Sequence, residues 1–234
     1  MKKLNHLCGF AGFGAIGVLV LVGCGMGGSS SSDESSQKTS ICMEDASDKT
    51  SLDSAPKTDW KNSLNGLKVP SSKEFGPEKV GDDKVPSCFQ HSPEGALFAA
   101  TNYSLPVIAQ DYGVMSKIIR EQALDNDARN QVAKKFEDQN SSASASSEAG
   151  DFQVAGFRIE NYAEDKATVK ILVSIYGGAG YGELTFTVQW DNDDWRFDAD
   201  ADTEDISFRQ VQGPDGYTEW GPDEQGGSSG PQGS

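Results

Sequence analysis

The sequence has few of the residues from which most recognisable active sites are built. It has 2 histidines and 4 cysteines among 234 residues. It contains no Gly-x-Ser-x-Gly elbow, phosphate-binding loop or zinc-spaced Cys/His cluster, so no signature of these enzyme and metal-site classes is present. Positive charge is also scarce, because 36 acidic side chains against 20 basic ones give a net charge of −16. A surface of that sign repels nucleic acid and anionic lipid headgroups, so direct nucleic-acid binding is not expected.

A long hydrophobic run is missing as well. The uncharged stretch 7–23 is rich in Gly, Val and Leu but is shorter than the ~20 strongly apolar residues that a spanning helix needs. Two lysines precede it, and it ends in Leu21-Val22-Gly23-Cys24, the pattern of a bacterial lipoprotein signal. We expect cleavage before Cys24, lipid on its thiol, and a mature chain held on the outer face of the cell membrane. An uncleaved membrane anchor is the alternative.

Cleavage at that point removes Cys8 and the lipid occupies Cys24, which leaves Cys42 and Cys88 as the two remaining cysteines of the mature chain. An even pair in an oxidising compartment favours a disulfide, with two free thiols as the alternative. It also leaves His91 as the single histidine. Because His91 stands just before a helix start, we interpret it as a helix-entry residue rather than a catalytic one.

Composition divides the chain into four parts. Residues 1–23 form the signal peptide, and residues 24–58, which have almost no large apolar side chains, form a lipidated, disordered linker. Residues 59–213 hold enough apolar residues for one α+β domain. Residues 214–234 become Gly/Ser/Pro-rich and are predicted to be a largely disordered C-terminal tail.

The first half of the domain has helical spacing after a loop-like stretch at 60–90. Ser92 is a good N-cap and Pro93 suits the first helical position, so a helix should begin there and kink or break at Pro106. Two further helices are expected over 114–124 and 126–139.

The second half alternates with a period of two. The cleanest strand runs from 184 to 190, a strand at 167–175 precedes it, and a phase slip at Ala155-Gly156 in the segment 152–162 predicts a β-bulge. Trp190 and Trp195 flank a tight turn and could pair across it, and a further strand is expected near 206–211.

Helices followed by an antiparallel meander with one apolar face predict an α+β fold, with N-terminal helices packed on a curved sheet. That order is similar to the cone-shaped nuclear-transport-factor-2-like (cystatin-like) fold. Such folds often hold a pocket between helices and sheet, and they serve many unrelated functions.

Short motifs spread from Trp60 to Pro222 carry a second resemblance. They are Leu67-Lys68-Val69-Pro70-Ser71, Phe89-Gln90-His91-Ser92-Pro93-Glu94-Gly95-Ala96, Gly156-Phe157-Arg158, Asp194-Trp195-Arg196 and Tyr217-Thr218-Glu219-Trp220-Gly221-Pro222. They resemble a family of exported proteins carried by conjugative elements and phages of Gram-positive bacteria. The resemblance implies an extracytoplasmic role linked to mobile elements, in a transfer channel, and it supplies no active site.

Candidate site residues are few. Asp111 and Tyr112 follow the first helix and could line the pocket of the fold, although a helix-end turn is the simpler interpretation. Tyr181, among glycines between two strands, could contact a partner. Trp220 could either dock a partner or pack back on the domain. The acidic run 198–205 has the alternation that calcium favours, but a solvated loop is preferred, and no metal or cofactor is expected.

The sequence thus favours a lipid-anchored, non-catalytic accessory or scaffold protein that binds membrane lipid through Cys24 and protein partners in the cell envelope. A module that binds a small apolar ligand between helices and sheet is the alternative. A cavity enzyme that uses Asp111 and Tyr112 is a more distant third.

Overall fold

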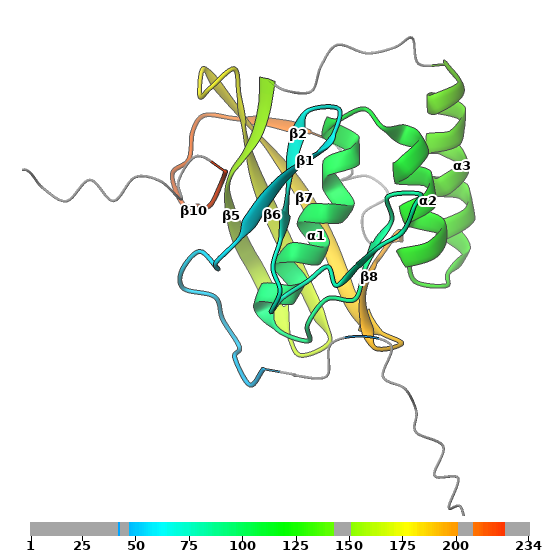
Figure 1. Ribbon diagram of the computed structural model, residues 1–234, viewed down its shortest axis with the longest axis horizontal. Helices are drawn as coiled ribbons and strands as arrows, with labels where there is room; N and C mark the ends of the chain where they lie inside the picture. The colour runs from blue at the N-terminus through cyan, green and yellow to red at the C-terminus, as the bar shows by residue number, and fades with distance from the viewer. Residues whose placement is uncertain (1–41, 43–46, 143–150, 201–207, 223–234) are drawn as a thin grey trace, which may run out of the picture. The chain divides into compact units, whose positions relative to one another are not determined.

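The computed structural model describes residues 42, 47–142, 151–200 and 208–222 (Figure 1). It confirms the α+β class, with three helices and a mostly antiparallel sheet in the described part. The nuclear-transport-factor-2-like likeness stays a prediction. The predicted signal peptide and Cys24 lie outside the described residues.

The helices fall close to their predicted positions. They are α1 (Pro93–Ile108), α2 (Tyr112–Gln122) and α3 (Asp127–Ser142). Ser92 caps α1 as expected, since its hydroxyl accepts a hydrogen bond from the Gly95 amide at 2.9 Å. The predicted break at Pro106 is wrong, since α1 continues through this residue and ends two residues later, at Ile108; a kink there stays a prediction.

The main sheet has the strand order β10-β5-β6-β7-β8, and β9 also pairs with β7. Its strands are β5 (Phe152–Ala163), β6 (Lys166–Ile175), β7 (Gly180–Asp191), β8 (Asp194–Phe197), β9 (Arg209–Val211) and β10 (Thr218–Glu219). The predicted bulge is confirmed by a register shift between Val154 and Gly156. Trp190 and Trp195 pair across the β7–β8 turn, as expected, with ring centroids 5.6 Å apart.

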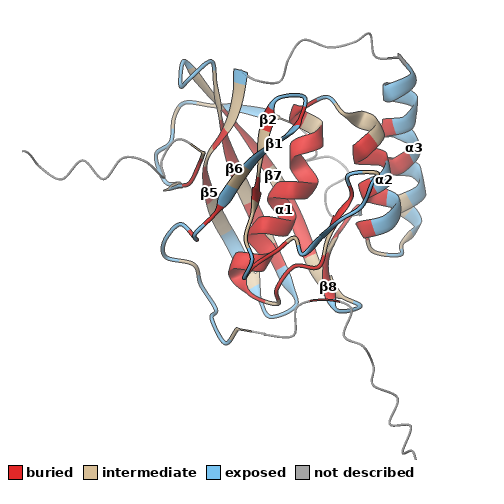
Figure 2. Cartoon of the chain, in the orientation of Figure 1, coloured by how far each residue is buried: buried red, intermediate tan, exposed pale blue. Residues whose placement is uncertain are grey.

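The core lies between α1 and one face of the sheet. Nearly every residue of α1 is buried, whereas α3 is exposed along one side (Figure 2). Tyr103 of α1 is fully buried and donates a hydrogen bond to the Trp195 backbone oxygen at 2.8 Å. From the sheet, alternate residues of β6 and β7 face the helix, and Val169, Ile171, Leu184, Phe186 and Val188 are all fully buried.

The stretch at 60–90 contains more structure than predicted. It forms β1 (Asp59–Leu64), β2 (Leu67–Ser71), β3 (Lys79–Val80) and β4 (Pro86–Ser87). The turn between β1 and β2 is Asn65-Gly66, and both residues have positive φ, 49° and 88°. Asn-Gly is the preferred pair for such a two-residue hairpin turn, so the local sequence did carry the signal.

The C-terminal part of the chain is also more ordered than predicted. Residues 214–222 belong to the fold rather than to a tail, since β10 pairs with β5 and Trp220 is only 2% exposed. Two glycines make room for this segment. A Cβ at Gly182 would overlap the Phe208 ring, and a Cβ at Gly156 would come within 2.8 Å of the Thr218 carbonyl oxygen.

Candidate functional site

A loop with an exposed aromatic side chain connects β6 to β7. We call residues 176–179 the Tyr176 loop. Tyr176 is 68% exposed, and it and Val80 are the large hydrophobic residues that the described chain leaves most open to solvent. Its backbone is held, because its amide donates to the Asp151 carbonyl oxygen at 2.8 Å. An exposed ring on a fixed backbone is a typical contact point for another protein.

A pocket of about 470 Å³ adjoins this loop. Its walls are the start of β5, the Tyr176 loop and the C-terminal segment: Gln153, Val154, Ala155, Ser174, Gly177, Gly178, Tyr181, Pro214, Tyr217, Glu219, Gly221 and Pro222. The structure therefore places the predicted contact residue Tyr181 in a pocket wall. Gln153 adds a buried side-chain oxygen with no hydrogen-bond partner among the described residues, and this oxygen could accept a bond from a ligand donor.

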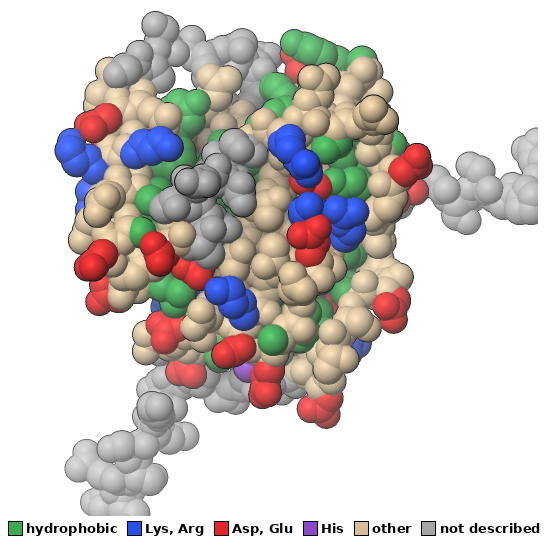
Figure 3. Space-filling model, turned by 180° about the vertical axis from the view of Figure 1, so that it is seen from behind, with side chains coloured by type: hydrophobic (Ala, Val, Ile, Leu, Met, Phe, Trp, Pro, Cys, Tyr) green, Lys and Arg blue, Asp and Glu red, His purple; other side chains and the backbone are tan. Residues whose placement is uncertain are grey.

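Next to this pocket, a cluster of charged side chains surrounds one buried carboxylate, that of Glu183 on β7. Figure 3 shows basic and acidic side chains gathered on this side of the molecule. Glu183 is 1% exposed and lies 3.5 Å from the Lys170 ammonium and 3.9 Å from the Arg158 guanidinium. Arg209 and the Tyr217 hydroxyl donate hydrogen bonds to its two oxygens.

The surroundings of Glu183 favour its charged form. Burial alone would raise its pKa, but the hydrogen bonds from Tyr217 and Arg209 and the charge of Lys170 outweigh burial and hold the pKa below its usual range. Burial and the same hydrogen bond raise the pKa of Tyr217 to about 12. The cluster therefore fixes the C-terminal segment onto the outer face of the sheet.

Trp220 is not a surface residue. Its ring packs against Trp60, Phe98 and Phe157, with centroids 5.0–5.7 Å away. Its indole nitrogen donates to the Thr58 hydroxyl at 2.8 Å. Of the two interpretations left open by the sequence, the structure shows the packed one, so Trp220 is not available for docking.

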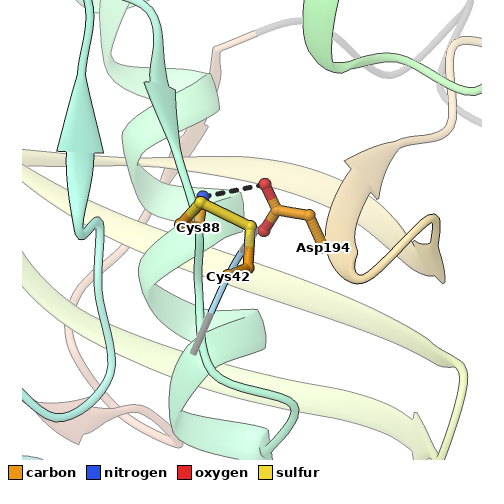
Figure 4. Close-up of side chains that lie close together, drawn as sticks. All are labelled: Cys42, Cys88 and Asp194. Atoms are coloured by element: carbon orange, nitrogen blue, oxygen red, sulfur yellow. Dashed lines mark hydrogen bonds between the residues drawn. A yellow bond between two sulfur atoms is a disulfide. The ribbon is translucent and has the colours of Figure 1, made fainter. Parts of the chain in front are cut away.

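A second buried carboxylate, that of Asp194 on β8, lies at the predicted disulfide. Cys42 and Cys88 are joined as a disulfide with Cα atoms 4.6 Å apart. Figure 4 shows the bridge beside Asp194. The two Asp194 oxygens accept hydrogen bonds from the amides of Cys88 at 2.8 Å and Phe89 at 2.9 Å. Since both sulfurs are bonded to each other, this cluster is a structural junction and not a set of thiolate metal ligands.

Asp194 differs from Glu183 in its pKa. Burial raises the pKa of Asp194, and the hydrogen bonds from the Phe89 and Cys88 amides and the charge of Arg196 oppose that rise without cancelling it. The Asp194 carboxyl group therefore holds backbone amides in place, whereas the Glu183 carboxylate is surrounded by cationic side chains.

His91 is used in packing. Its ring stacks on Trp190 with centroids 4.0 Å apart and planes 9° apart. Its Nε2 lies 2.6 Å from the Glu164 carbonyl oxygen, to which it donates. These contacts fit the predicted helix-entry role, with the imidazole tying the start of α1 to the β5–β6 turn.

Asp111 and Tyr112 are structural in the described chain. Asp111 caps α2, because its carboxylate accepts from the Val114 amide at 3.2 Å. Tyr112 packs on Phe136 of α3, with ring centroids 6.0 Å apart. Neither residue lines the pockets described here. The two residues therefore form the helix-end turn that is the simpler interpretation of the sequence. They do not line these pockets in the way that the alternative interpretation requires.

Part of the acidic run can be described. Asp198 lies 3.2 Å from the Lys166 ammonium, and its other oxygen accepts from the Asp200 amide at 3.2 Å. The remainder of the run, 201–205, lies outside the described residues. In the part of the chain that the structure describes, no helix is long and apolar enough to span a membrane.

Comparison with known proteins gives one family match. No curated protein matches the chain, and no solved structure matches it. Residues 26–219 match the family model described as a domain of unknown function, DUF8175. That span contains the disulfide, all three helices and every strand of the main sheet. The chain therefore belongs to the DUF8175 family.

Proposed function

We propose that this protein is a lipid-anchored, non-catalytic accessory protein on the outer face of the cell membrane, where it serves as a scaffold in a conjugative transfer apparatus. In this proposal Cys24 carries the lipid, and the Tyr176 loop binds a partner protein. The family description names no activity, so the support comes from the chain itself.

The tether in this proposal is short. Between Cys24 and Cys42, residues 25–41 can span at most about 60 Å when fully extended. The disulfide then connects the chain to the start of α1, where Asp194 holds Cys88 and Phe89. A partner bound by the domain would therefore be kept close to the membrane surface.

The single observation that carries the binding role is the exposed Tyr176 ring beside a pocket of about 470 Å³. Aromatic residues on a rigid backbone are enriched at the centres of protein interfaces. The adjoining pocket offers a partner two further kinds of contact. The Tyr181 side chain supplies apolar surface, and the Gln153 side-chain oxygen, which has no partner among the described residues, can accept a hydrogen bond.

The small-ligand alternative needs a cavity between α1 and the sheet. The described residues on that interface pack directly against each other, with Phe98, Tyr103, Phe157 and Phe186 all at most 1% exposed. The pockets beside the main sheet lie at its periphery instead. A pocket of about 260 Å³ lies between α1, α2 and the small β1–β2 sheet, not between α1 and the main sheet. We therefore favour the partner-binding role.

The test is photo-cross-linking of the full-length lipoprotein in its native cells, with a photoreactive amino acid in place of Tyr176. The matched control places the same group at Lys135, an exposed position on α3. We expect one or more envelope proteins to be captured from position 176 and lost when Cys24 is changed to serine. Equal capture from both positions, or none from 176, would contradict the proposal.

A further inference from the structure

A separate pocket lies at the other end of β6, at the β5–β6 turn. It has a volume of about 280 Å³. Its walls come from the segment that follows Cys42, the residue before the Ser92 cap of α1, and the β5–β6 turn. They are Ser47, Asp48, Lys49, Thr50, His91, Tyr162, Ala163 and Glu164. This volume is at the small end of ligand sites and suits a short aliphatic group.

A buried carboxylate is joined to the wall of this pocket through Lys49. Glu94, in the first turn of α1, has a side chain only 3% exposed. One of its oxygens accepts a hydrogen bond of 2.5 Å from the Lys49 ammonium, which comes from the pocket wall. Its other oxygen is buried and has no partner among the described residues. A buried carboxylate oxygen normally has a donor, so Glu94 lacks one that its burial calls for.

The charges around the pocket also favour a cation. Asp48 and Glu164 in the wall and Glu94, the partner of Lys49, are acidic, and Lys49 is the one lysine or arginine among the lining residues. Burial raises the pKa of Tyr162 to about 12, and the negative charges of Glu94 and Glu164 contribute to that rise.

The aromatic wall suits the stem of such a ligand. The rings of Tyr162 and His91 both line the pocket, and His91 is held flat against Trp190. Aromatic faces attract ammonium groups and pack well on methylene chains.

We propose that this pocket binds an aliphatic primary ammonium group, with Glu94 as its counter-ion, and that Lys49 occupies the site as a built-in competitor. Lys49 is suited to leave, because its side chain is 60% exposed and its segment, described from residue 47 to 57, contains no helix or strand. The site lies at the opposite end of β6 from the Tyr176 loop, so the proposal does not depend on the partner-binding role.

The test compares the wild-type protein with the variants Lys49→Met and Glu94→Gln. Calorimetry measures binding of two probes, the diamine cadaverine and Nα-acetyl-lysine amide, which represent a free polyamine and a peptide lysine side chain. Tetramethylammonium at the same ionic strength is the control, because it is a cation that cannot donate a hydrogen bond. Thermal unfolding of each variant with and without probe gives a second measurement.

We expect saturable binding of a primary amine to the wild type, and loss of that binding in Glu94→Gln. Because a lysine on the same chain competes at a high effective concentration, Lys49→Met should bind at least about tenfold more tightly. Its Tm should fall and be restored by the primary amine but not by tetramethylammonium. Preference between the probes identifies the source of the amine.

Two results would overturn the proposal. The first is absence of saturable binding to the wild type, which would make Lys49–Glu94 a structural ion pair only. The second is equal binding by the wild type and Glu94→Gln, which would place the amine elsewhere. If Lys49→Met does not fold, this second comparison decides the question alone.

Discussion

Two carboxylates in neighbouring strands are both removed from water, and the protein stabilises them in opposite ways. Asp194 on β8 is held by backbone amides, two from the segment before α1 and one from Trp195. Glu183 on β7 is held by side chains, those of Lys170, Arg158, Arg209 and Tyr217. Burial raises the pKa of Asp194 although its amide donors oppose the rise, whereas the donors and cations around Glu183 outweigh burial and lower its pKa.

The kind of donor around each carboxyl group indicates how rigid its region is. Amide donors are part of the backbone, so Asp194 fixes the course of the chain at the disulfide junction. The cations around Glu183 lie on long side chains, and that of Arg209 is 66% exposed. Such pairs hold a segment in place with less rigidity and are weakened by salt. The junction is therefore the firmer of the two regions, and the C-terminal segment is the more adjustable.

Replacing Asp194 should have the largest effect. In Asp194→Ala the amides of Cys88 and Phe89 lose their acceptor while remaining buried, so we expect a loss of about 3 kcal/mol in the free energy of unfolding. Urea denaturation with the disulfide intact measures this. Asp194→Asn keeps the shape and one acceptor oxygen, so it should lose less.

The matched control for that variant is Asp191→Ala, in the same β7–β8 hairpin. Asp191 accepts a side-chain hydrogen bond from its neighbour Asn192, at an exposed position. We expect a change of no more than about 0.5 kcal/mol. Equal losses in the two variants would mean that the amide contacts of Asp194 contribute nothing particular to the junction.

Replacing Glu183 should have a smaller effect. Glu183→Gln retains an acceptor for Tyr217 but removes the attraction to Lys170 and Arg209, and we expect a loss of about 1–2 kcal/mol in denaturant unfolding at low salt. High salt should reduce that loss.

The comparison variant is Glu160→Gln, which changes the other acid of the same cluster. Glu160 pairs with Lys170 at 2.8 Å and with Arg158 at 3.3 Å, but its side chain is 35% exposed. Its replacement should cost less than about 1 kcal/mol. A larger loss in Glu160→Gln than in Glu183→Gln would show that burial is not what makes Glu183 important.

Much of the fold could be predicted from local patterns. The Ser92 cap, the bulge at Gly156 and the alternation of Leu184, Phe186 and Val188 each depend on neighbours within a few residues. The β1–β2 hairpin does not follow from the loop predicted for residues 60–90. The Asn65-Gly66 pair indicates a hairpin turn, but the prolines and glycines of the surrounding stretch are typical of a loop.

The sites could not be predicted in the same way. Glu183 occupies a polar position in an alternating strand, and such positions normally face solvent. It becomes buried because Arg209 and Tyr217, which come later in the chain, cover it. The sequence predicts Asp194 as a turn residue, and two of its three amide donors, those of Cys88 and Phe89, are more than 100 residues earlier. The sequence pattern indicates Tyr181 rather than Tyr176, since exposure of a single ring has no local signature.

The smallest and most discriminating effect is the pH dependence of the two variants. The folded-state pKa of Glu183 is lowered, so its contribution is present above the unfolded value of about 4.3 and is lost as pH falls below it. The folded-state pKa of Asp194 is raised, so its contribution is greatest below the unfolded value of about 3.9 and declines as pH rises through the folded value. On acidification, the stability difference between wild type and Glu183→Gln should therefore shrink, while that between wild type and Asp194→Asn should grow. Unfolding free energies of the three proteins across that pH range measure both trends. Parallel trends would show that the pKa values of the two carboxyl groups are not shifted in opposite directions on folding.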